Sequence, residues 1–68
     1  MRLAEIFGRN VRKARLEKGW SQEHLAFEAE LQRTYISEVE TGKRNPTLDV
    51  VEAIARVLEV KATDLLVE

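Results

Sequence analysis

The sequence has no cysteine and only one histidine and one proline among its 68 residues. Without cysteine there can be no disulfide, thiolate metal site or cysteine nucleophile, and His24 alone cannot build a zinc site. We therefore expect neither a metal nor a cofactor. A chain this short buries a modest core, so it needs efficient helix packing, which dimerisation would support.

Long apolar runs are also missing. No stretch approaches the roughly 20 apolar residues of a transmembrane helix, and the first residues, MRLAEIFGRN, lack the apolar region of a signal peptide. We therefore expect a cytoplasmic protein with no membrane partner, forming a single domain over residues 1–68.

The chain has almost no net charge, −1 in total, which by itself disfavours a nucleic-acid partner. The charge is unevenly distributed, however. It changes from +4 over residues 1–18 to −2 over residues 19–44 and −3 over residues 45–68. Because local charge steers binding more than the total does, the polarised distribution leaves such a partner open.

Apolar residues recur at three- and four-residue spacing, and no alternation with a period of two is sustained. This pattern predicts an all-α fold of five helices, at about residues 2–18, 21–28, 32–40 and 47–58, with a short helix after Thr63. Ser21 and Thr47 are the expected N-caps, and Gly19 and Gly42 follow two of the helix ends.

The apolar stripes of these helices predict the core. Trp20 is expected to anchor it, whereas Phe27 falls off the stripe and His24 is expected at the surface. The predicted stripe residues are Leu3, Ile6, Phe7, Val11, Ala14, Leu25, Ala26, Ala29, Ile36, Val39, Leu48, Val51, Ile54, Ala55 and Leu58.

The second and third predicted helices are separated by only about three residues, Ala29 to Leu31. Two short helices joined in this way are typical of a helix-turn-helix, whose second helix enters the DNA major groove with its N-terminal residues. If Ile36 points to the core, the outer face carries side chains suited to base edges. These are Gln32, Arg33, Thr34, Ser37 and Glu38.

Residues 5–66 resemble helix-turn-helix regulators of the Cro and phage-repressor (XRE) type. The resemblance is carried by the segments RLEKGWSQ, LA at 25–26, RTYIS, VETGKRNP and IARVLEV. It implies a compact, lambda-repressor-like DNA-binding domain. The segment RTYISEVE further resembles the small controller proteins of restriction–modification systems.

The resemblance also implies roles for matching residues. Gln32, Arg33, Thr34, Ser37 and Glu38 would face bases, while Arg15 and Glu40 would form an internal salt bridge. The family usually has glycine in the turn where this chain has Glu30, which puts a side chain at a positive φ. The residues implied to contact the DNA backbone are Gln22, Tyr35, Lys43, Arg44 and Asn45.

Glu38 has three possible roles. It could accept a hydrogen bond from a cytosine amino group, or repel wrong bases while orienting Arg33, or be an ordinary surface residue.

One such domain reads too few base pairs to select a genomic site, which predicts a homodimer on a palindromic operator. The C-terminal aliphatic residues are the expected interface, unless they simply close the core of one chain. They are Leu58, Val60, Leu65, Leu66 and Val67.

The sequence as a whole predicts a nucleoid-associated transcriptional regulator without enzymatic activity and without an evident small-molecule effector. The alternative is a protein-interaction module with the same fold, such as an antitoxin subunit or an adaptor. The near-neutral charge and the exposed position expected for Phe27 would suit that alternative.

Overall fold

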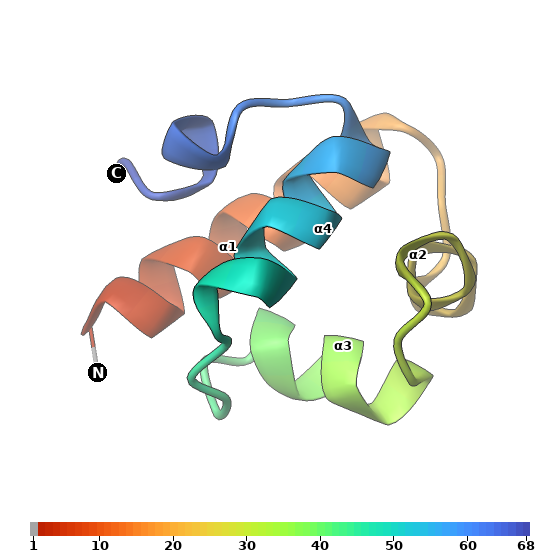
Figure 1. The fold of residues 1–68 in the computed structure, drawn as a ribbon, viewed down its shortest axis with the longest axis horizontal. Coiled ribbons are helices and arrows are strands. Elements are labelled where there is room, and N and C mark those ends of the chain that lie inside the picture. The colour runs from red at the N-terminus through yellow and green to blue at the C-terminus, as the bar shows by residue number, and fades with distance from the viewer. Residues whose placement is uncertain (1) are drawn as a thin grey trace.

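The computed structural model describes residues 2–68, which form four α-helices and one 3₁₀ turn (Figure 1). The elements are α1 (Arg2–Glu17), α2 (Gln22–Ala29), α3 (Arg33–Glu40), α4 (Leu48–Leu58) and the 3₁₀ helix η1 (Ala62–Leu65). No strand occurs within residues 2–68, so the all-α prediction is confirmed. None of these helices has the length and apolar character needed to cross a bilayer.

The predicted fifth helix is wrong in type and start. Instead of an α-helix after Thr63, the chain makes a single 3₁₀ turn over Ala62–Leu65, in which the Asp64 N–H donates to the Lys61 carbonyl at 2.9 Å. Lys61, just before this turn, has an extended backbone, and a helical segment of four residues favours the tighter i→i+3 turn.

The two predicted N-caps are confirmed. The Ser21 hydroxyl accepts from the His24 N–H at 3.0 Å, and the Thr47 hydroxyl accepts from the Val50 N–H at 3.2 Å. Each bond satisfies one of the backbone donors that a helix start leaves without a partner. The caps therefore set where α2 and α4 begin.

All four α-helices end in one hydrogen-bond pattern, in which the next two backbone N–H groups bond to carbonyls of the last turn. The pattern requires a residue in the left-handed conformation, for which glycine is preferred. Two of the four residues are glutamates, at an expected cost of about 1–2 kcal/mol each. The four left-handed residues are Gly19, Glu30, Gly42 and Glu59, with φ of 73°, 58°, 77° and 61°.

The core is built mainly from the predicted stripes, with two corrections. Leu3 and Leu48 lie in the first turns of α1 and α4 and are exposed, Leu48 by 83%. Both line an apolar hollow together with Leu66 rather than packing under another helix. The largest fully buried side chains are Phe7, Val11, Leu25, Ile36, Val39 and Ile54.

The aromatic residues in and just before α2 behave nearly as predicted. Phe27 is 79% exposed, and His24 is also at the surface. Trp20 is only half-buried: it packs on the core with one side, and its ring stacks on His24 at 4.4 Å. Trp20 thus covers the edge of the core rather than filling its centre.

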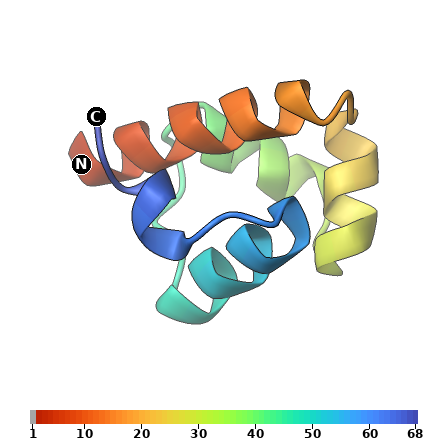
Figure 2. The same cartoon turned by 90° about the horizontal axis from the view of Figure 1, so that it is seen from above.

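The arrangement of the helices places α3 at one side of the molecule. It packs against α1 and α2, while α2 also packs on α4 and η1 packs on α1 and α4 (Figures 1 and 2). At Gly8 the backbones of α1 and α3 meet, since a Cβ there would lie 2.0 Å from the Val39 carbonyl oxygen. Glycine is therefore required for this close approach.

The C-terminal segment folds back onto α1 (Figure 2). The Asn10 side chain donates to the carbonyls of Leu65 and Val67 at 3.0 and 2.7 Å, and Arg2 pairs with Glu68. These contacts hold η1 over the core.

This packing corrects part of the predicted dimer interface. Leu58 and Leu65 are 3% and 2% exposed, so they close the core of one chain and are not available to a partner. Val60 and Leu66 are half-buried and Val67 is exposed. The end of α4 and the turn η1 bury Leu58 and Leu65, whereas Val60, Leu66 and Val67 lie outside these elements, a difference that a run of aliphatic letters does not reveal.

Candidate nucleic-acid interface

The turn between α2 and α3 is a tight, left-handed reversal. Glu30 adopts φ 58° and ψ 42°, and the Leu31 N–H donates to the Ala26 carbonyl at 2.8 Å. Gln32 then has an extended backbone and begins α3 without a side-chain cap. The short turn predicted from the sequence is present, with glutamate in the position where the family resemblance expects glycine.

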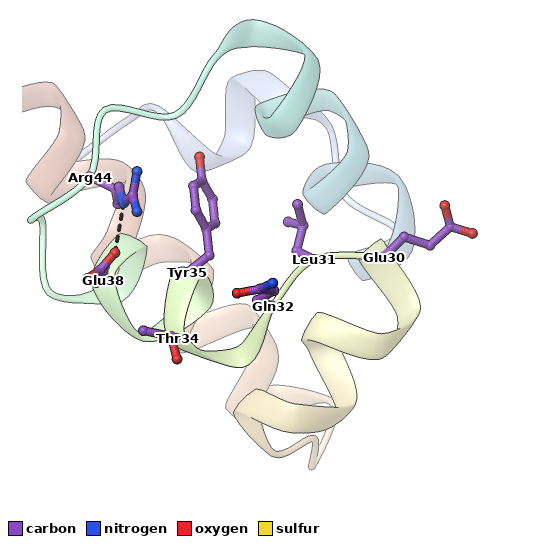
Figure 3. A pocket seen from close by; sticks show the side chains of 7 residues that line it. All are labelled: Glu30, Leu31, Gln32, Thr34, Tyr35, Glu38 and Arg44. Atoms are coloured by element: carbon purple, nitrogen blue, oxygen red, sulfur yellow. Dashed lines mark hydrogen bonds and ion pairs between the residues drawn. The ribbon is translucent and has the colours of Figure 1, made fainter.

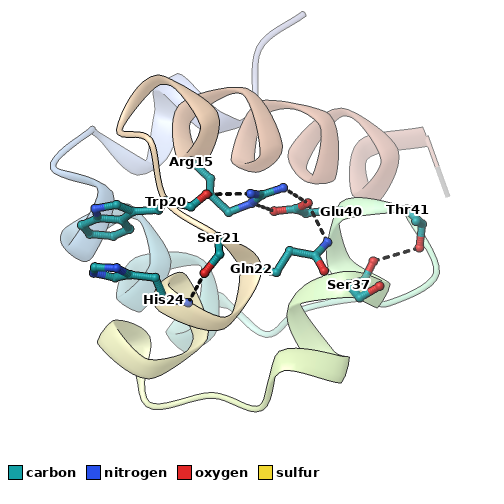
Figure 4. A network of polar contacts seen from close by, with 8 residues as sticks. All are labelled: Arg15, Trp20, Ser21, Gln22, His24, Ser37, Glu40 and Thr41. Atoms are coloured by element: carbon teal, nitrogen blue, oxygen red, sulfur yellow. Dashed lines mark hydrogen bonds and ion pairs between the residues drawn. The ribbon is translucent and has the colours of Figure 1, made fainter.

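A buried ion pair fixes α3 against α1. Arg15 Nε donates to Glu40 Oε2 at 2.7 Å and Arg15 Nη2 to Glu40 Oε1 at 3.0 Å. Their side chains are 8% and 2% exposed. Arg15 Nη1 also donates to the Trp20 carbonyl at 2.8 Å, which ties in the loop before α2 (Figure 4). The structure thus brings together the pair implied by the resemblance.

Gln22 joins this network from α2. Its Nε2 donates to Glu40 Oε1 at 3.1 Å, so the side chain predicted to contact the DNA backbone has an internal partner in the free protein (Figure 4). Glu40 therefore links α1, α2 and α3. The relative orientation of the two helix-turn-helix helices depends on this carboxylate, because both polar contacts converge on it.

The N-terminal end of α3 is open to solvent. Gln32, Arg33 and Thr34 are exposed, and none of the hydrogen bonds or ion pairs found within residues 2–68 uses their side chains. Ser37 is half-buried one turn further along. Ile36 and Val39 are buried on the opposite side, as predicted, so the outer face of α3 presents amide, guanidinium and hydroxyl groups.

Glu38 has a partner that the sequence did not predict. Its Oε1 accepts from Arg44 Nε at 2.7 Å, and the Arg44 guanidinium lies 5.1 Å from the centre of the Tyr35 ring (Figure 3). The hydrogen bond and the charge of Glu38 raise the pKa of Arg44 above its ordinary value. Arg33, which Glu38 would orient in one of its three possible roles, is not bonded to it.

These three residues border an open hollow of about 450 Å³ beside the turn, lined also by Glu30, Leu31, Gln32 and Thr34 (Figure 3). Tyr35 is half-buried against the core. The turn residue Glu30 points away from the other side chains (Figure 3). The hollow therefore lies between the N-terminal end of α3 and the guanidinium of Arg44.

The segment after α3 carries the remaining predicted backbone contacts. The Gly42 N–H donates to the Val39 carbonyl at 3.1 Å and the Lys43 N–H to the Glu38 carbonyl at 2.9 Å, which turns the chain sharply. Lys43, Arg44 and Asn45 are all exposed. The turn therefore keeps the start of this segment next to the C-terminal end of α3, where Arg44 reaches Glu38.

Two contacts of this site were missed by sequence reasoning, Gln22 with Glu40 and Glu38 with Arg44. The first joins α2 to α3 across 18 residues, and the second joins α3 to the segment after it across 6 residues. Helical side-chain pairing occurs at three or four residues, so no sequence pattern reports these pairs. Only the turn at Gly42 brings Arg44 back over Glu38.

Comparisons with known proteins agree with this geometry. A family model described as helix-turn-helix matches residues 11–65. The control protein C.BamHI of Bacillus amyloliquefaciens is 53% identical over 62 residues, which cover 90% of this chain and 76% of that protein.

Two solved structures are also similar. The restriction–modification controller C.AhdI from Aeromonas hydrophila has a TM-score of 0.88 at 39% identity, covering 91% of this chain and 94% of its own. The controller C.Esp1396I, solved as a tetramer in complex with its natural 35 base-pair operator, has a TM-score of 0.84 at 41% identity, covering 93% and 83%. The chain therefore belongs to the helix-turn-helix family, as its resemblance to Cro and phage-repressor type regulators predicted.

Proposed function

We propose that this protein is a sequence-specific DNA-binding transcriptional regulator that places α3 in the major groove. The observation that supports this most directly is the solvent-open N-terminal end of α3. There, Gln32, Arg33 and Thr34 have no internal partners within residues 2–68, on a helix held from behind by Arg15 and Glu40. Arginine pairs with guanine and glutamine with adenine in this setting. The protein would act by occupying its site rather than by catalysis.

The segment after α3 would supply the phosphate contacts. Lys43 and Asn45 are exposed there, and both side chains can donate hydrogen bonds to phosphate oxygens. Such contacts position the protein without reading sequence. Similarity to three restriction–modification control proteins supports the narrower proposal that this protein regulates the genes of a restriction–modification system. It would do so at the nucleoid.

We further propose that the protein binds as a homodimer, through an apolar surface that replaces part of the interface predicted from sequence. Leu66 lines an apolar hollow with the exposed residues Leu3 and Leu48, and Val67 is exposed in the same C-terminal segment. Apolar groups exposed together on a small domain favour a protein contact. A two-fold dimer would double the number of bases read.

Selection of bound duplexes from a random DNA pool tests this function. We expect a palindrome, with half-sites separated by about 34 Å or a multiple of it, because a two-fold dimer presents two copies of α3. Failure to enrich any sequence would contradict sequence-specific binding. Enrichment of a single half-site would contradict the dimer.

Arg33→Ala and Lys43→Ala should have different effects on the selected sequence. Arg33→Ala should weaken operator binding by about 1–3 kcal/mol and relax one base position, because the guanidinium reads a base edge. Lys43→Ala should weaken all duplexes alike and flatten the salt dependence, because it removes one phosphate contact. An unchanged base preference for Arg33→Ala would show that this residue does not read the operator.

The interaction-module alternative is supported by the 79% exposure of Phe27 on the outer side of α2. A mobility shift on random genomic DNA at several salt concentrations separates the two functions. A DNA-binding protein shows a shift that weakens steeply with salt, whereas a pure interaction module shows none.

A further inference from the structure

Glu38 is the one acidic side chain on the proposed recognition face whose role the function above leaves unexplained. We propose that Glu38 is a specificity-determining residue. It keeps Arg44 from DNA phosphates until a matching base takes the place of Arg44 as the partner of Glu38. This inference rests on the proposed DNA-binding function.

In the free protein, Glu38 occupies Arg44 in the way that a DNA phosphate would. Its carboxylate accepts from Arg44 Nε at 2.7 Å, and the guanidinium lies over Tyr35 at 5.1 Å from the ring centre (Figure 3). Carboxylate and phosphate oxygens are both acceptors for arginine donors. In the free protein, therefore, Arg44 already has the kind of partner that DNA would offer.

The cluster is also open enough to exchange partners. The side chains of Arg44 and Glu38 are 52% and 38% exposed. An ion pair with this exposure contributes little to stability, because water screens both charges. A phosphate at the edge of the groove could therefore draw Arg44 away without disturbing the fold.

Losing Arg44 would leave Glu38 unpaired on the DNA-facing side of α3. An unpaired carboxylate near phosphates is repelled and loses hydration, which weakens binding to an arbitrary duplex. A duplex that presents a cytosine amino group can donate to the same carboxylate and restore its partner. Discrimination would then arise at Glu38 through rejection of wrong sequences as much as through attraction to the right one.

A double-mutant cycle on a random-sequence duplex tests the withholding step. The four proteins are wild type, Glu38→Gln, Arg44→Gln and the double variant, each checked for folding by circular dichroism. Glu38→Gln should tighten binding in both backgrounds, and about two- to fivefold more when Arg44 is present, because only then does it also free a cation. The salt slope should steepen by about 0.9 in the Arg44 background only.

Equal effects of Glu38→Gln in the two backgrounds would overturn the proposal, since Glu38 would then act on DNA directly. A smaller effect with Arg44 present would also overturn it, because freeing Arg44 from Glu38 would then add no phosphate contact. Glu52→Gln, on the exposed side of α4, makes the same change in charge and should show no dependence on residue 44.

The discrimination step is tested on the selected operator. Glu38→Gln should tighten binding to the operator less than to random duplex, so the ratio of the two affinities falls. An unchanged ratio would overturn the specificity role. Wild-type protein that does not bind any duplex at low salt would refute the proposed function itself, whereas binding with an additive cycle would refute only this inference.

Discussion

Glu40→Ala should lower the free energy of unfolding by about 3–5 kcal/mol, because it leaves the Arg15 guanidinium buried without its counter-charge. The Arg15 side chain is 8% exposed, and it donates to both carboxylate oxygens of Glu40. Gln22 loses its acceptor in the same variant. A domain of this size has a total stability of about 3–10 kcal/mol, so much of the protein should be unfolded at 37 °C.

Urea denaturation followed by circular dichroism measures this effect. The matched control is the double variant Arg15→Met, Glu40→Leu, which removes both charges and keeps most of the volume. It should recover most of the loss, since replacing a buried ion pair by apolar side chains is often neutral. If the free energy of unfolding of Glu40→Ala were within about 1 kcal/mol of the wild-type value, the Arg15 guanidinium would have to become hydrated in the variant at little cost.

Gly8→Ala should destabilise the protein by about 3 kcal/mol, near the upper end of the range for overpacking. A Cβ at this position would lie 2.0 Å from the Val39 carbonyl oxygen, so α1 and α3 must move apart. Alanine is otherwise the better residue within a helix, by about 1 kcal/mol. A loss of stability would therefore come from the steric conflict between the helices.

Gly19→Ala is the comparison for this variant. A Cβ at Gly19 meets no atom within 4 Å, but the residue has φ 73°, so only the backbone conformation is strained. Its expected loss is about 1–2 kcal/mol, smaller than that of Gly8→Ala. Thermal unfolding of both variants checks the order. A Gly8→Ala protein as stable as wild type would show that α1 and α3 can move apart without loss of stability.

The local features of this fold could be predicted from the sequence. Ser21 and Thr47 cap the helices they precede, and Ile36 and Val39 lie on the buried side of α3. Each depends on residues within one helical turn, where spacing alone decides which groups meet. The short link between the second and third helices indicated the helix-turn-helix for the same reason.

The direction of apolar side chains near helix ends could not be predicted. Leu3 and Leu48 continue the stripes of their helices but lie outside the body of the molecule, whereas Leu58 and Leu65 are fully inside it. An apolar residue at the correct spacing is buried only if another segment covers it. That depends on where the C-terminal segment folds back, which Asn10 and η1 determine.

The four α-helices, the caps of α2 and α4 and the outward face of α3 can be predicted from the order of residues alone, because hydrogen bonding and side-chain spacing within a helix are local. How the two acids of α3 are used follows from the packing of the helices. Glu40 is enclosed by α1 and α2 and holds the helix in place, whereas Glu38 meets Arg44 across the turn at Gly42. Contacts between distant residues follow from packing, and spacing along the chain does not record them.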